Sequence, residues 1–243
     1  MLSPTKIVSP GSANILANNK RLFQSAQEYR DAVDSDFEEL DRDRYEKTTQ
    51  ELLDRSYRLL GDRVSVTIEQ QGVLTVIRVL ASPDGTTLAG IYHFPKTSRN
   101  RGVEGKTLFM IDLETEFGDG TFLMTSNSLE INQLTPPPAI KTQRLALETP
   151  LAEMIEAHES YKQQALAARP GSSCTVVDTM EDAAEFQKRE HAVKVAFRTK
   201  IGHVDPEEIH RIAKSKGIDD NTADAIANAA NEAAKKEGEG SSG

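Results

Sequence analysis

Cysteine, tryptophan and long apolar runs are scarce or absent in this sequence, and each absence excludes a class of protein. The 243 residues include one cysteine, Cys174, and no tryptophan. A single cysteine forms neither an intramolecular disulfide nor a cysteine-based zinc site. No uncharged apolar stretch reaches the length of about 18 residues that a transmembrane helix needs. The N-terminus also lacks an apolar run of signal-peptide length, so we expect a soluble, cytoplasmic protein.

Apolar residues are also few, at 37%, whereas charged residues make up 28% of the chain. The length is sufficient to bury a core without disulfides, but this composition predicts a modest core with solvated helices around it. The net charge is −9. Broad binding to nucleic acid or to an anionic membrane needs clustered lysine and arginine, so the acidic balance disfavours both. We therefore expect no nucleic-acid partner.

The first 60 residues predict a disordered segment followed by a long helix. Residues 1–20 are rich in proline, glycine, serine and asparagine, which is typical of loosely packed termini. Between residues 22 and 60 the apolar side chains recur every three or four positions, and Gly61 would end the helix. Because so long a helix would expose charge on three sides, we expect it to project, to pair with another subunit or to lie across a sheet. The large side chains available for such a contact are Phe23, Tyr29 and Phe37.

Residues 63–127 change to an alternation of apolar and polar side chains, which is the period of half-buried strands. The sequences "SPDG" (82–85) and "GDG" (118–120) predict turns. Because short connections make successive strands antiparallel, we expect an antiparallel β-meander of about five strands. The predicted strands are residues 63–70, 73–81, 86–94, 107–117 and 121–126.

A proline-rich segment follows, and then helical signals return. Residues 128–147 contain "TPPPAI", which fits neither a helix interior nor a central strand, so an extended linker is predicted. Asp178 and Glu181 match a capping box, whereas Asp205 and Gly217 match the start and stop of a later helix. Residues 205–236 outline two helices and a turn, but the second helix begins "DDNTADA", whose acidic charge would repel DNA. We favour a helical hairpin that packs on its neighbours.

These patterns predict an α+β fold. It consists of an antiparallel β-meander of about five strands, preceded by a long N-terminal helix and followed by a helical C-terminal part. The predicted segments are a disordered stretch at 1–20, a helix-plus-meander domain with its linker at 21–147, a helical part at 148–237 and a flexible tail at 238–243.

Gly105-Lys106-Thr107 resembles the end of a phosphate-binding loop, but the pattern around it does not fit. The position of the first glycine is occupied by Asn100, and a strand pattern follows instead of the helix that would face a phosphate. No nucleotide or other cofactor is therefore expected. The loop is still the most basic local feature, and Arg99, Arg101 and Lys106 are candidates for contact with an anion or an acidic partner. A solvated hairpin tip is the interpretation we favour.

The sequence "DLETE" places Asp112, Glu114 and Glu116 at alternate positions, which on a strand puts them on one face about 7 Å apart. Such a row is typical of binding to a hard metal ion or of catalysis by paired carboxylates. His93, on the preceding strand, is its natural companion. A row of this kind is also typical of the solvent face of an antiparallel strand, which is the interpretation we favour.

The pattern favours a non-catalytic accessory or scaffold domain that acts through protein contacts, either with a partner or by self-association. The alternative is a metal-dependent or carboxylate-based hydrolase that uses Asp112, Glu114 and Glu116 as catalytic or metal-binding groups with His93. These carboxylates should lie in a concave pocket if they are catalytic, and on a flat surface if they are solvated.

Overall fold

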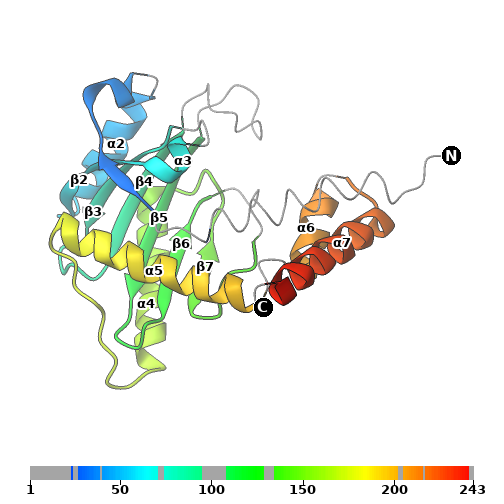
Figure 1. Cartoon of the computed structure of the whole chain (residues 1–243). Coiled ribbons are helices and arrows are strands. Elements are labelled where there is room, and N and C mark those ends of the chain that lie inside the picture. The colour runs from blue at the N-terminus through cyan, green and yellow to red at the C-terminus, as the bar shows by residue number, and fades with distance from the viewer. Residues whose placement is uncertain are drawn as a thin grey trace. The chain divides into compact units, whose positions relative to one another are not determined.

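The computed structural model describes residues 23, 27–38, 40–70, 74–94, 108–128, 134–201, 205–215 and 217–240 (Figure 1). The elements in chain order are β1 (Tyr29–Asp31), the 3₁₀ helix η1 (Asp34–Phe37), α2 (Arg42–Leu53), β2 (Arg58–Ser65), α3 (Val66–Glu69), β3 (Val76–Ala81), β4 (Leu88–Phe94), β5 (Leu108–Glu116), β6 (Phe122–Ser126), β7 (Ile140–Arg144), α4 (Leu151–Ala167), α5 (Met180–Lys200), α6 (Pro206–Ser215) and α7 (Asp220–Gly240). None of these helices is long and apolar enough to span a membrane.

In the described part of the chain, seven strands form one sheet and lie in the order of the sequence, from β1 to β7. Neighbouring strands are antiparallel, except that β6 and β7 are parallel with Phe122 opposite Ile140. The α+β class and the mostly antiparallel sheet are confirmed. The sheet has seven strands rather than about five, because β1 and β7 extend the predicted meander at its two edges.

The long helix predicted for residues 22–60 is wrong. The described part of this segment contains β1, η1, α2 and the start of β2. Two aspartates interrupt the helix. A side-chain oxygen of Asp36 accepts a hydrogen bond from the Val33 N–H at 2.8 Å, and the Asp41 side chain accepts one from the Arg44 N–H at 3.2 Å. Aspartate favours such turn and cap positions over helix interiors, so the apolar spacing alone was misleading.

Two further boundaries differ from the sequence prediction. The strand predicted at 63–70 ends at Ser65, whose hydroxyl accepts a hydrogen bond from the Ile68 N–H at 3.4 Å and starts the helical turn α3. The segment predicted as a linker contains β7, which begins two residues after its last proline, Pro138. Proline is excluded from the hydrogen-bonded ladder, but the residues that follow it can enter the ladder.

The helices expected after residue 148 are present as α4 to α7. The capping box of α5 is shifted by one residue, because Thr179 and Asp182 exchange backbone-to-side-chain hydrogen bonds at 3.1 and 3.0 Å. At α6 the expected cap is confirmed, since Asp205 Oδ1 accepts from the Glu207 N–H at 3.0 Å. Gly217 has a φ of 70°, the left-handed conformation that ends helices.

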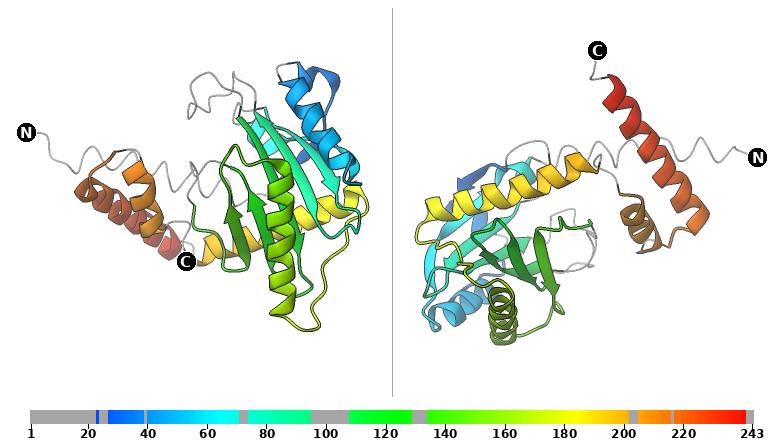
Figure 2. Two further views of the ribbon diagram at one scale, coloured as in Figure 1. Left: turned by 180° about the vertical axis from the view of Figure 1, so that it is seen from behind. Right: turned by 90° about the horizontal axis from the view of Figure 1, so that it is seen from below.

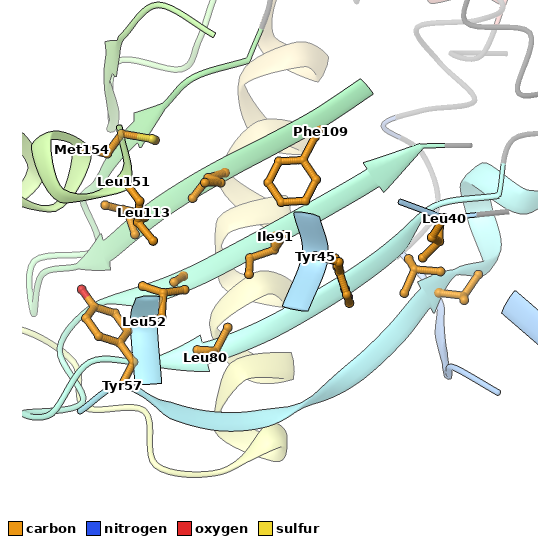
Figure 3. Close-up of a cluster of buried hydrophobic side chains, with 14 residues drawn as sticks. Leu40, Tyr45, Leu52, Tyr57, Leu80, Ile91, Phe109, Leu113, Leu151 and Met154 are labelled. Carbon is orange, nitrogen blue, oxygen red and sulfur yellow. The ribbon is translucent and has the colours of Figure 1, made fainter. Parts of the chain in front are cut away.

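The sheet separates two layers of helices (Figure 2). We call its two sides the α2/α4 face and the α5 face; the latter is covered by the part of α5 up to Glu190. The main apolar core lies on the α2/α4 face, where Ile91 and Leu113 of the sheet pack with Tyr45, Leu52 and Met154 of the helices (Figure 3). Full burial of one such side chain stabilises the fold by about 1.5–3 kcal/mol.

A second compact unit includes residues 134–137, α5 from His191 onward, α6 and α7. Within this unit, Thr135 is hydrogen-bonded to both α5 and α6. Its N–H donates to Glu208 Oε2 at 2.8 Å, and its carbonyl accepts from Arg198 Nη2 at 3.1 Å. Arg198 and Glu208 form a buried ion pair of 2.7 Å. The residue in front of the prolines is therefore anchored by side chains of α5 and α6 that follow it by 63 and 73 positions in the chain.

Gly90 leaves room on the α5 face for the ring of Tyr92. A methyl group at Gly90 would lie 2.8 Å from Tyr92 Cε2 and 3.3 Å from Cζ. We expect Gly90→Ala to lower the free energy of unfolding by about 1–3 kcal/mol, the usual effect of overpacking. Chemical denaturation measures this effect. Gly118→Ala is the matched control, because its new methyl would make an ordinary contact of 3.4 Å with Ser173; equal losses in the two variants would contradict the role of the Tyr92 ring.

Candidate functional site

The acidic row lies on one face of β5, but this face is covered. Glu114 and Glu116 are only 8% and 5% exposed, so the row is not the solvent face that we favoured from the sequence. Arg189 of α5 donates from Nε and Nη2 to the two carboxylate oxygens of Glu116 at 2.8 and 2.7 Å. This bidentate ion pair neutralises Glu116 and fixes α5 over the strand.

Other polar side chains share the α5 face with the row. Burial raises the pKa of Tyr92 well above its usual value, and the nearby charges of Glu114 and Asp112 raise it further. Arg63 of β2 is 4% exposed, and its guanidinium carbon lies 4.3 Å from the centre of the Tyr29 ring. Burial lowers the pKa of Arg63. This face is therefore a covered layer of charged and phenolic groups that sequence alternation alone did not reveal.

The structure does not bring His93 to the acidic row. His93 lies opposite Phe109, and its ring packs edge-on against Phe109 and Tyr45 on the α2/α4 face. Its Nε2 accepts a hydrogen bond from the Asp41 N–H at 3.1 Å, and burial lowers its pKa to about 4. His93 is thus a neutral core histidine separated from the carboxylates by the sheet. Among the described residues, no three or more His, Cys, Asp or Glu side chains are grouped to hold a metal ion.

The aromatic partner candidates from the N-terminal segment are in contact with the protein itself. The Phe37 ring lies 6.1 Å from that of Tyr45, beside the main core. The Tyr29 ring faces Arg63 as described above, and the Phe23 ring lies 5.3 Å from the guanidinium carbon of Arg198. Their predicted role in partner binding stays a prediction.

The basic loop candidates Arg99, Arg101 and Lys106 lie outside the described residues, as does the whole of Gly105-Lys106-Thr107. Their predicted contact with an acidic partner therefore also stays a prediction.

A groove runs between β7 and α4, which no pattern in the sequence indicated. It consists of two adjoining cavities of about 260 and 420 Å³ that share Tyr161 and Gln164 of α4. The smaller cavity is mainly apolar and includes Leu123 and Ala168. The larger one is bounded by polar groups such as Gln143 and Ser160. We call the two cavities together the β7–α4 groove.

The strand beside this groove is an edge of the sheet. The Phe122 N–H donates to the Ala139 carbonyl at 2.8 Å, and the Leu145 N–H donates to the Ser126 carbonyl at 2.9 Å. Along a parallel ladder, alternate residues bond to the neighbouring strand. Lys141 and Gln143 therefore also bond to β6, whereas three residues direct N–H and C=O away from it. These are Ile140, Thr142 and Arg144, and no described strand pairs with them.

The chain matches no protein-family model, and comparisons with curated proteins and with solved structures find no match. The function proposed below is therefore inferred from the contacts, burial and charges of this chain itself.

Two buried histidines should make stability fall as the solution becomes mildly acidic. Burial lowers the pKa of His93 to about 4 and that of His158, in α4, to about 3, from the ordinary value of 6.5. Below pH 6.5 the unfolded chain therefore binds protons that the folded chain does not. The stability that depends on these neutral histidines is therefore fully present above this pH. Between pH 6.5 and 5 we expect the free energy of unfolding to fall by about 1.5 kcal/mol per histidine.

Urea denaturation over this pH interval measures the loss. His93→Gln keeps a side-chain oxygen that can accept the hydrogen bond from Asp41 but cannot be protonated in this range. The variant should lose about half as much stability on acidification as the wild type. An identical pH dependence in the two proteins would show that His93 takes up protons equally well when folded and unfolded.

Removal of Arg189 should destabilise the fold because Glu116 would remain buried without its partner. We expect Arg189→Met to lower the free energy of unfolding by about 1–3 kcal/mol, less than for a fully buried pair because the Arg189 side chain is 44% exposed. Lys188→Met, at a 72% exposed neighbour, should change it by less than about 0.5 kcal/mol. Addition of Glu116→Gln should restore part of the loss; without such coupling, the ion pair would have no stabilising role.

Proposed function

We propose that this chain is a protein-binding domain that receives an extended segment of a partner along β7, beside the β7–α4 groove. The observation that carries the proposal is the row of outward backbone groups on Ile140, Thr142 and Arg144 next to a groove that can accept side chains.

The edge of β7 offers a pattern that an extended backbone can match. Each of the three outward residues presents one N–H and one C=O, and a segment in strand conformation satisfies such groups by pairing as a further strand. The five residues of β7 span about 17 Å, which suits a short peptide segment. Backbone pairing of this kind contributes affinity but little sequence preference.

On this proposal, the groove supplies the preference for particular side chains of the bound segment. Side chains of an added strand alternate between the two faces of the sheet, so every second one would project toward α4. There the two cavities differ, one mainly apolar and the other bounded by amides and hydroxyls. An edge strand that provides hydrogen bonds beside a helix that shapes the pockets is a recurring arrangement for peptide recognition.

The hydrolase alternative lacks comparable support among the described residues. Glu116 is bound at both oxygens by Arg189, and His93 lies on the other face of the sheet from the carboxylates. We therefore retain the protein-contact proposal.

Thr142→Pro tests the proposal directly. The N–H at this position points away from β6, so proline removes an outward donor and leaves the β6–β7 ladder intact. We expect peptides of about ten residues, selected on the wild-type protein from a random phage-displayed library, to bind this variant at least roughly tenfold more weakly. Fluorescence polarisation with the synthetic peptides measures the change.

Thr142→Ala is the matched control, because it removes the side chain and keeps the N–H; it should bind like the wild type. Unfolding curves verify that both variants fold. Failure to select any peptide, or equal binding to the proline variant, would contradict the proposal. Concentration-dependent dimerisation that Thr142→Pro abolishes would instead identify a second copy of this chain as the occupant.

A further inference from the structure

We infer, on the basis of this proposed function, that the bound segment is acidic. This segment places an apolar side chain in the smaller cavity of the β7–α4 groove and adjacent carboxylates on Lys141 and Arg169.

The charge of the groove is opposite to that of the whole chain. The chain has a net charge of −9, yet among the described residues only two charged ones, Lys141 and Arg169, line the cavities. No Asp or Glu in the described part of the chain lines either cavity, although these residues number 38 in the sequence. A local positive site on an acidic protein favours an acidic partner over a basic one.

Both cations are available to a ligand. Lys141 is exposed and forms no ion pair with any described residue. Arg169 is held over the Phe117 ring, with its guanidinium carbon 5.1 Å from the ring centre. It also forms an ion pair with Asp119, whose Oδ2 lies 3.7 Å from Nε, a distance beyond hydrogen-bond length. Arg169 is therefore positioned by the ring and retains donors for a carboxylate of the segment.

The smaller cavity explains why an apolar side chain should accompany the acids. Its walls include Phe117, Leu123, Tyr161 and Ala165, and its volume of about 260 Å³ suits one side chain such as leucine. Asp119 offsets part of the charge of Arg169, and the C-terminal end of α4 adds partial negative charge nearby, so Lys141 supplies most of the net positive charge. Aliphatic burial and ion pairing thus act at neighbouring positions of the segment.

The polarity of β7 also gives the segment a direction. Lys141 lies at the start of β7 and lines the smaller cavity, whereas Thr142 and Gln143 line the larger one. Antiparallel pairing is slightly the more stable mode of strand addition. A segment bound in this mode would place its C-terminal part at the smaller cavity, so we expect the apolar and acidic residues near that end.

The library peptides selected on the wild-type protein test this inference. We expect them to be enriched in Asp and Glu next to an aliphatic residue toward their C-terminal ends. Synthetic peptides in which these acids are replaced by Asn and Gln should bind roughly tenfold more weakly, and the difference should shrink at high salt because exposed ion pairs are screened.

Charge reversal provides the matched comparison. Lys141→Glu combined with Arg169→Glu should make the acidic peptide bind more weakly than its amide form. Lys188→Glu combined with Lys47→Glu changes the net charge equally at exposed sites that line neither cavity and should preserve the preference for acids.

The two proposals fail in different ways. If selected peptides lose binding to Thr142→Pro but bind equally well with acids or amides, strand addition stands and the acidic preference is wrong. If peptides bind Thr142→Pro as well as the wild type, the strand-addition proposal itself is wrong. An acid preference that survives the charge reversal would place the acid-binding groups outside the groove and overturn the inference.

Discussion

The arrangement at the candidate binding edge depends on the parallel pairing of β6 and β7. Each strand from β2 to β6 runs antiparallel to the strand before it. β7 instead runs in the same direction as β6, so the first residues of the two strands lie opposite each other. Buried Asn127 holds the exits of these strands together. Its Oδ1 accepts from the Ile111 N–H at 2.7 Å, and its Nδ2 donates to the Leu147 carbonyl at 3.2 Å. The chain therefore leaves β7 in a fixed place, and α4 packs on β6 and β5 with the groove between it and β7.

The α5 face imposes a different constraint, which is charge neutralisation. A carboxylate taken from water into the protein costs several kcal/mol unless a partner and hydrogen bonds compensate. Glu116 meets this requirement through Arg189, so the sequence of α5 is matched to the acidic face of β5. Glu116, one of the carboxylates that suggested catalysis, is thereby explained as part of the contact that positions α5. The carboxylate of Glu116 therefore serves a structural role, because it binds Arg189 of α5.

The elements that could be predicted correctly from the sequence are the longer and more regular ones. β3 to β6 were found because their alternation persists over several residues, and the turn at 82–85 is confirmed by the Gly85 N–H donating to Ser82. β1 and β7 have three and five residues with little apolar alternation, and they exist because the sheet provides an edge to pair with. Alternation also cannot distinguish a solvated face from a face that a distant helix covers. Glu116 was misjudged for this reason, since Arg189 follows it by 73 positions.

The groove could not be found from sequence for a related reason: its walls come from Phe117, from β6 and β7, and from the middle and C-terminal end of α4, and only the fold assembles them. Once assembled, β7 must avoid indiscriminate pairing while it remains open at its edge. Its residues are mostly polar, and Lys141 and Arg144 carry like charges that oppose close approach of a second β7. An acidic segment meets no such repulsion and gains from Lys141. The charges that protect the edge from self-association are thus, on this inference, also the charges that select the partner.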